Sequence, residues 1–160
     1  MDIRLRPLRS DEFPDFLELL RVEYVRGLVE EAGLTLESAE EKAAADHASL
    51  FPDRAPQPNH RISIVEDAAT GERNGHLFWA ARQPPGSAGK RAYLYELFID
   101  ESFRGRGLGR RALELLEAEA RDEGLPGIDL NVWGGNQAAR GLYRSAGFEE
   151  RAVFMSKELE

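Results

Sequence analysis

The sequence predicts an α/β or α+β fold built around a mixed sheet with helices packed on it. A strand over 91–100, a helix over 107–123 and a strand over 128–132 follow one another, and a helical connection of this kind makes the two strands parallel. Two earlier strands, 61–66 and 75–82, are joined by a short turn and are expected to form an antiparallel hairpin. The sheet should therefore be mixed and mostly antiparallel.

The first third of the chain predicts one strand and two helices. Ile3 and Leu5 alternate with arginines, which is typical of a strand with one buried face. Ser10 is a candidate N-cap for a helix with one apolar stripe, and Thr35 begins a second helix with a face of small residues. Residues 51–59 are rich in proline and are expected to form a loop.

The last third predicts a further strand and helix after the βαβ unit. Gly124 ends the helix over 107–123. Asn136 opens another helix, and Gly147 closes it. Residues 148–157 are expected to supply a last strand or hairpin.

Length and composition predict one globular domain over residues 1–160. The hydrophobic share of 42% is ordinary for a folded protein. The chain has no cysteine, which excludes disulfides, thiolate metal sites and a cysteine nucleophile. Its N-terminus has no signal-like apolar core, and no run is long enough to span a membrane. We therefore expect a cytoplasmic protein with no membrane partner.

The charge of the chain is acidic, with a formal net value of −8. This charge favours solubility and disfavours nucleic acid as a partner. An acidic surface is also compatible with a cationic acceptor such as an amine. The three histidines are scattered and have no carboxylate at ligand spacing, so no metal site is expected.

The turn between the strand over 91–100 and the next helix carries the strongest functional signal. Its glycines allow backbone N–H groups to approach a ligand, and a helix N-terminus carries about half a positive charge. Four arginines add positive charge within the same short stretch: Arg104, Arg106, Arg110 and Arg111. The ligand is expected to carry phosphate.

Two nucleotide-binding patterns were compared with this turn. A Walker A loop is excluded, because no Gly-Lys-Ser/Thr follows the glycines. Gly107-x-Gly109-x-x-Ala112 fits the Rossmann fingerprint, and Asp129 lies where a ribose-binding acid is expected. The context disagrees, because the fingerprint should follow its strand almost directly and too little chain remains for further βα units.

Residues 104–109, with the pattern Arg-x-x-Gly-x-Gly, resemble the acyl-coenzyme A loop of the GNAT acetyltransferases. Residues 136–148, with the pattern Asn-x-x-Ala-x-x-Leu-Tyr-x-x-x-Gly-Phe, are similar to the helix of that family whose Asn and Tyr face the thioester. The order and separation of the two motifs also match. The resemblance implies a GNAT-like acyl-CoA N-acyltransferase fold of the bacterial type.

The resemblance also implies how acetyl-coenzyme A, or coenzyme A, would bind. In the family, the strands corresponding to 93–99 and 128–132 splay apart, and the pantetheine arm fills the gap by pairing with free backbone groups. The glycine turn would hold the pyrophosphate. The implied contacts are Leu97, Phe98, Ile99, Arg104, Gly105, Arg106, Gly107, Leu108, Gly109, Arg110, Asn136 and Tyr143.

Two residues are predicted to be catalytic. Tyr143 matches the family tyrosine beside the sulfur and would protonate the departing thiolate. Glu96 is the only carboxylate inside the central strand and is the candidate base, although strict alternation would point it away from Tyr93 and Tyr95 unless a bulge intervenes. A water ordered by those two tyrosines is the alternative base. His60 is a further candidate for contact with the acceptor.

The predicted function is transfer of acetyl from acetyl-coenzyme A to a primary amine, on a small molecule or a protein. A silent coenzyme A sensor on the same fold and, more remotely, an NAD-binding oxidoreductase are the alternatives. Dimerisation is common in the resembled family, so a homodimer is compatible with the sequence, although nothing in it identifies an interface.

Overall fold

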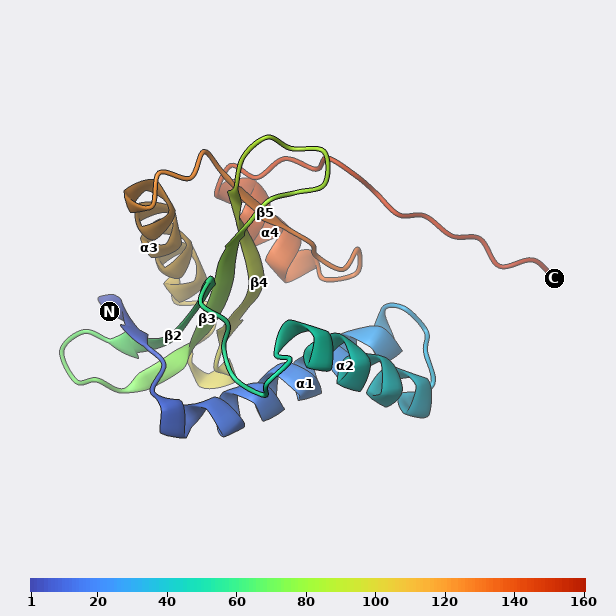
Figure 1. Ribbon diagram of the computed structural model, residues 1–160, viewed down its shortest axis with the longest axis horizontal. Helices are drawn as coiled ribbons and strands as arrows, with labels where there is room; N and C mark the ends of the chain where they lie inside the picture. The colour runs from blue at the N-terminus through green and yellow to red at the C-terminus, as the bar shows by residue number, and fades with distance from the viewer.

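The computed structural model describes residues 1–160 and contains a five-stranded sheet with four α-helices (Figure 1). The strands are β1 (Ile3–Pro7), β2 (His60–Asp67), β3 (Arg73–Arg82), β4 (Arg91–Ile99) and β5 (Ile128–Leu130). The helices are α1 (Phe13–Glu30), α2 (Leu36–Leu50), α3 (Leu108–Asp122) and α4 (Gln137–Ser145), with short 3-10 turns at Ser10–Glu12 and Glu101–Phe103.

The strands lie in the order β1-β2-β3-β4-β5. The first three pairings are antiparallel and only β4 and β5 run parallel, on either side of α3. The predicted mixed, mostly antiparallel sheet is therefore confirmed. A single parallel pair is not the doubly wound sheet of an NAD-binding oxidoreductase.

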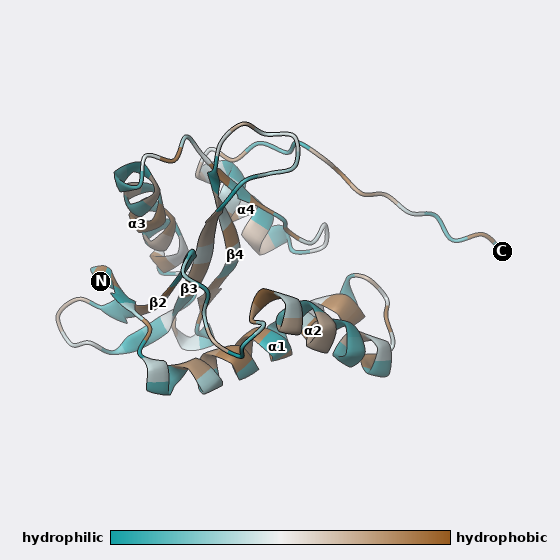
Figure 2. Cartoon of the chain, in the orientation of Figure 1, coloured by the Kyte–Doolittle hydropathy of each residue, from teal (hydrophilic) through white to brown (hydrophobic).

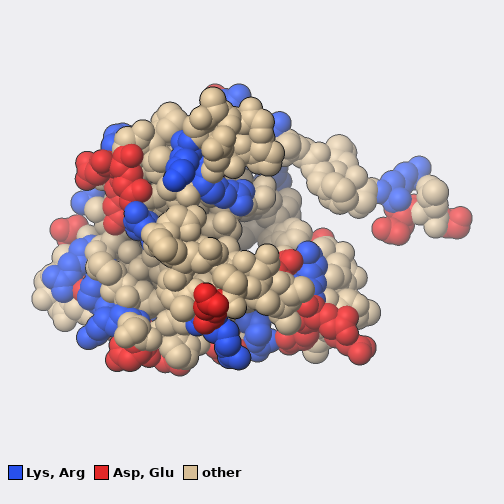
Figure 3. Space-filling view, viewed as in Figure 1, with Lys and Arg blue, Asp and Glu red and all other residues tan.

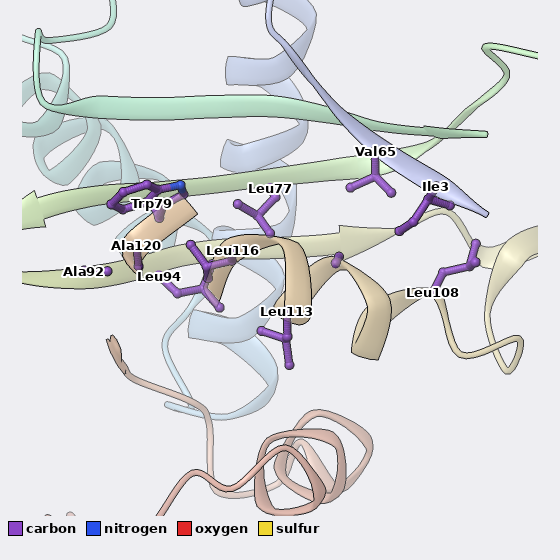
Figure 4. Close-up of a cluster of buried hydrophobic side chains, with 11 residues drawn as sticks. Ile3, Val65, Leu77, Trp79, Ala92, Leu94, Leu108, Leu113, Leu116 and Ala120 are labelled. Carbon is purple, nitrogen blue, oxygen red and sulfur yellow. The ribbon is translucent and has the colours of Figure 1, made fainter. Parts of the chain in front are cut away.

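Helices cover both faces of the sheet. On one face α3 packs on β3 and β4, and this cluster has Trp79, Leu94 and Leu116 at its centre (Figure 4). On the other face α1 packs through Phe16 against Phe78, with α2 behind it. Figure 2 shows the apolar character of β3 and β4 between these layers. Burying large aromatic and aliphatic side chains on both faces makes β3 and β4 the rigid centre of the molecule.

A β-bulge interrupts β4 where the catalytic base was predicted. Leu97 lies opposite Leu77 and Leu94 lies opposite Trp79, so two residues of β4 occupy the space that Phe78 alone spans in β3. Glu96 is the registered partner of Phe78, and Tyr95 is the extra residue. The bulge therefore shifts the alternation of side chains along β4 by one residue.

The parallel pairing of β4 with β5 is short. Only Ala92, Tyr93 and Leu94 pair with β5, which ends at Leu130 and so is shorter than the strand predicted over 128–132. β4 continues to Ile99 with no neighbouring strand on that side. The outer edge of β4 beyond Leu94 is therefore open.

The strand or hairpin predicted for residues 148–157 is wrong. These residues contain no helix or strand and run away from the sheet (Figure 1). Their apolar side chains are not buried, and Phe154 is 94% exposed. A strand requires a neighbour that accepts its hydrogen bonds, and this segment meets none.

No helix of the chain is long and apolar enough to cross a bilayer.

Candidate active site

The turn before α3 adopts the backbone that its glycines predict. Gly105 and Gly107 have positive φ angles of 73° and 79°, in the left-handed region that other residues rarely adopt. Gly107 is the N-cap of α3, and no side chain caps this helix. The first N–H groups of α3 therefore point out of the turn without a capping partner, as an anion-binding helix end requires.

Three arginines of this turn have no carboxylate partner. Arg104 donates its Nε–H to the carbonyl of Ile99 at 2.8 Å, and Arg110 donates to the carbonyl and hydroxyl of Ser145 at 3.0 and 2.6 Å. The guanidinium of Arg106 lies 5.4 Å from the ring centre of Phe103. These contacts hold the side chains in place but leave their positive charges unneutralised. Arg111, by contrast, pairs with Glu114 at 3.0 Å.

The other residues predicted to hold the cofactor contribute in different ways. The Leu108 side chain is buried in the core, so only its backbone faces the turn. At Gly109 an added Cβ would lie 3.0 Å from Leu142, so glycine allows α3 and α4 to approach closely. Asn136, which was predicted to contact the cofactor, caps α4 by accepting the N–H of Ala139 with its side-chain oxygen at 3.1 Å.

The three β4 residues predicted to bind by their backbone lie along the open edge of that strand. Leu97 packs against the α3-side core, and Phe98 stacks on His76 with ring centres 5.3 Å apart. Ile99 ends the strand, and its carbonyl is held by Arg104. The side chains are anchored while the outer edge of the backbone has no strand beside it.

Glu96 lies on the α1 face of the sheet because of the bulge. In the register with β3, Glu96 lies opposite Phe78 and Tyr93 lies opposite Ala80. Phe78 and Ala80 are two residues apart and face the same side of the sheet, so Glu96 and Tyr93 share that face. Tyr95 joins them there, with its ring 4.7 Å from that of Phe78. The alternation argument against Glu96 is therefore overturned.

The carboxyl of Glu96 forms no ion pair or hydrogen bond with another residue. Burial, together with the negative charge of Glu23 on α1 and against the opposing effect of Arg26, raises its pKa to about 7. A carboxyl group with this pKa is partly deprotonated at neutral pH and accepts a proton readily. The environment of Glu96 is thus that of a general base.

Tyr143 of α4 lies close enough to Glu96 to sense its charge. Burial raises the pKa of Tyr143 to about 12, and the carboxylate of Glu96 adds to this shift. The ring packs against Phe148 at 5.6 Å, while the hydroxyl makes no hydrogen bond within the protein. The structure therefore brings together the two residues predicted to be catalytic, one of them a protonated hydroxyl with its donor free.

The other candidates around β4 have structural partners. The Tyr93 hydroxyl accepts from Nδ2 of Asn131 at 2.8 Å, which ties β4 to the chain after β5. His60 is buried beside Phe51 and Phe78, and burial lowers its pKa. Its Nδ1 accepts the backbone N–H of Gln57 at 3.1 Å, so His60 organises the proline-rich loop.

Sequence reasoning missed the part of the site that α1 supplies. Glu23 and Arg26 act on Glu96 from more than sixty positions earlier in the chain. Trp133, in the loop before α4, packs so closely on Gly27 that no side chain fits there. No local pattern marks these residues, because their role depends on α1 crossing the sheet beside β4.

No group of three or more His, Cys, Asp or Glu side chains is arranged to hold a metal ion.

Comparisons with known proteins show what this chain resembles in sequence and in fold. The sequence model of the Acetyltransferase (GNAT) family matches residues 33–148. The N-acetyltransferase YycN of Bacillus subtilis is 29% identical over 99% of this chain and 100% of its own, and its crystal structure superposes with a TM-score of 0.90. YdgE, another Bacillus subtilis N-acetyltransferase, is 29% identical over 99% of both chains.

A more distant structure shares the fold alone. An acetyltransferase of Clostridium acetobutylicum, crystallised with acetyl-CoA, is 16% identical over 98% of this chain and 96% of its own, with a TM-score of 0.66.

Proposed function

The chain belongs to the GNAT family of acetyltransferases, and from this premise we propose that it transfers acetyl from acetyl-coenzyme A to a primary amine. The observation that carries the proposal is the open edge of β4, with Glu96 on that strand and Tyr143 near enough for the Glu96 charge to raise its pKa. A base and a proton donor at one site are what attack of an ammonium group on a thioester requires.

The residues around this edge fit an acyl-coenzyme A ligand. Backbone groups on the outer edge of β4 beyond Leu94 would pair with the amides of the pantetheine arm, which satisfies both partners. The unneutralised guanidinium groups of Arg104, Arg106 and Arg110, with the first N–H groups of α3, would hold the pyrophosphate. The pantetheine arm would thus bind the edge of β4, and the pyrophosphate would bind the turn before α3.

Each catalytic residue would move one proton. Glu96 takes a proton from the incoming ammonium, and the nitrogen lone pair then attacks the carbonyl carbon of the acetyl group. As the new C–N bond forms and the C–S bond breaks, the sulfur receives a proton from Tyr143, the second nitrogen proton restores the Tyr143 hydroxyl, and Glu96 then releases its proton to water. The products are the acetamide and free coenzyme A, with one proton released to water in total.

Calorimetric titration of acetyl-coenzyme A into the protein, followed by an amine panel with detection of free thiol, tests this proposal. We expect saturable binding, and thiol release that depends on the added amine and yields the acetylated product by mass spectrometry. Binding without thiol release for every small amine, peptide N-terminus and lysine side chain tested would leave only a coenzyme A-binding protein. Absence of binding would refute the whole site.

A further inference from the structure

Arg82 is positioned like a ligand-binding group, beside the first residue of β4 and before the bulge in that strand. Arg82, the last residue of β3, lies beside Arg91 of β4 in the sheet register. Its guanidinium carbon is 3.4 Å from the ring centre of Tyr93 and 5.7 Å from that of Tyr95. Flat stacking on an aromatic face fixes the guanidinium plane while leaving its N–H edge free to donate.

The positive charge of Arg82 is not neutralised by the protein. Its neighbour Arg91 donates two hydrogen bonds to Asp129, at 2.8 and 2.9 Å, so those two charges cancel. Arg82 has no carboxylate partner, and its protein contacts are with the Tyr93 and Tyr95 side chains. An arginine held over tyrosine rings with no carboxylate beside it is suited to binding the carboxylate of a ligand.

Most arginines of this chain are paired with a carboxylate, so the unpaired ones are informative. They are Arg54, Arg73, Arg82, Arg104, Arg106 and Arg110. Three of these belong to the turn before α3, where the proposed function places the pyrophosphate. Arg82 is the unpaired arginine on the α1 face of β4, where the proposed base Glu96 also lies.

The path from Arg82 to the reacting groups is short and lined by one strand. Tyr93, Tyr95 and Glu96 share the α1 face, so the stacked guanidinium stands at one end of this row and the proposed base at the other. At about 3.3 Å per residue, the row spans roughly 7–10 Å. Figure 3 shows basic side chains gathered near the end of the sheet where β3 and β4 join, above a recess that opens toward α1 and α2.

We propose that Arg82 recognises a carboxylate on the acceptor, so that the preferred substrates are small amines with a carboxylate at the far end of a short chain. The inference rests on the proposed function, because it names the acceptor class of the same site. An extended ω-amino acid such as 5-aminopentanoate spans a distance comparable with the row from Glu96 to Arg82. Its ammonium reaches the base while its carboxylate accepts from the guanidinium.

The test compares matched acceptors that differ only in the carboxylate. Thiol release is measured with 5-aminopentanoate and with pentylamine, then with the homologous pairs one carbon shorter and longer. We expect kcat/KM to favour the amino acid about tenfold or more, mainly through KM, since charge-assisted hydrogen bonds of this kind are the strong ones. Arg82→Gln should abolish this preference, and Arg82→Lys should restore only part of it because an ammonium cannot form the bidentate contact.

Arg121→Gln is the matched control. Arg121 is an exposed arginine on α3 that pairs with Glu117, away from β4, and its loss changes the net charge equally. The melting temperature of each variant reports whether it is folded. Equal turnover of amino acids and neutral amines, or a preference that survives in Arg82→Gln, overturns the inference but not the proposed function. Failure of every amine to release thiol overturns the proposed function and the inference with it.

Discussion

The turn over residues 104–110 and the β4 row over residues 93–96 carry different halves of the proposed reaction, and they are built differently. The turn is continuous in sequence, and its glycines and arginines act on a ligand through local backbone shape and charge. The β4 row depends on a bulge, on α1 and on α4, which bring Glu23, Arg26 and Tyr143 to Glu96. Binding of a phosphate ligand is thus a local property, whereas the proton-transfer site is a tertiary one.

This difference predicts how the two regions respond to substitution. A charge substitution at Arg106 should weaken ligand binding and leave the remaining site intact, because the Arg106 side chain contacts only the neighbouring Phe103 ring. A change in the β4 row should alter proton transfer and its pH dependence with little effect on binding of coenzyme A. The following predictions test that separation.

Substitution of the base should have the largest effect. Glu96→Gln keeps the shape of the side chain but removes the proton acceptor, and we expect kcat/KM to fall by about 10²- to 10⁴-fold. In the natural protein kcat/KM should rise with pH through about 7, because Glu96 must be deprotonated to act. A pH–rate profile checks both, and an unchanged rising limb in Glu96→Gln would assign the base elsewhere, for instance to a water near Tyr93.

Removal of the proposed proton donor should have a smaller effect. Tyr143→Phe should lower kcat by roughly ten- to a hundredfold, less than loss of the base, because a thiolate leaves more readily than a stronger base does. Affinity for coenzyme A, measured by calorimetry, should change little because the ring remains in place against Phe148. If turnover equals that of the unaltered protein, Tyr143 has only a packing role.

A charge substitution in the turn should affect binding alone. Arg106→Gln should weaken coenzyme A binding by more than about 1 kcal/mol, since charge-assisted hydrogen bonds are worth about 1.5–3 kcal/mol each. The affinity should also depend less on salt than that of the natural protein. Calorimetry at two salt concentrations measures both effects, with Arg121→Gln as the control. Unchanged affinity at both concentrations would remove Arg106 from the phosphate site.

The last prediction concerns stability, not turnover or ligand binding, at a residue beneath the ligand edge of β4. His76 is fully buried between Phe16 and Phe98, its ring nitrogens have no partner, and burial lowers its pKa to about 3. Because the pKa of His76 is lower in the folded state, the unfolded chain binds a proton at this histidine at a higher pH than the folded protein does. Protonation of His76 therefore has no effect on stability above pH about 6.5, and stability falls by about 1.4 kcal/mol per pH unit as the pH drops from there toward 3.

His76→Leu should flatten this acid dependence. Glu96 acts in the opposite direction, because its raised pKa gives stability that is present below about pH 4.5 and lost as the pH rises through about 7. The two groups therefore oppose each other between about pH 4.5 and 6.5, and the substitution should reveal the slope due to Glu96. Denaturant unfolding at several pH values measures this, and parallel curves for the two proteins would show that His76 does not control the acid limb.

Secondary structure and the ligand turn followed from the sequence because their causes are local. Thr35 caps α2, accepting the N–H of Ser38 at 3.2 Å, and Gly107 takes the left-handed conformation that its turn requires. Residues 148–157 were predicted wrongly for the opposite reason. They contain the apolar run 152–155, but a strand forms only where a partner edge is available.

The sequence by itself determined the family and the order of elements as far as α4, and it predicted Glu96 and Tyr143 as catalytic residues, because spacing along one chain segment carries that information. Only the tertiary structure decided which way Glu96 faces, because one extra residue in β4 reverses the alternation of every side chain beyond it. It also decided that Arg82 stands over Tyr93 without a carboxylate partner. Contacts between strands depend on register and on helices that cross the sheet, and neither is encoded in any single segment.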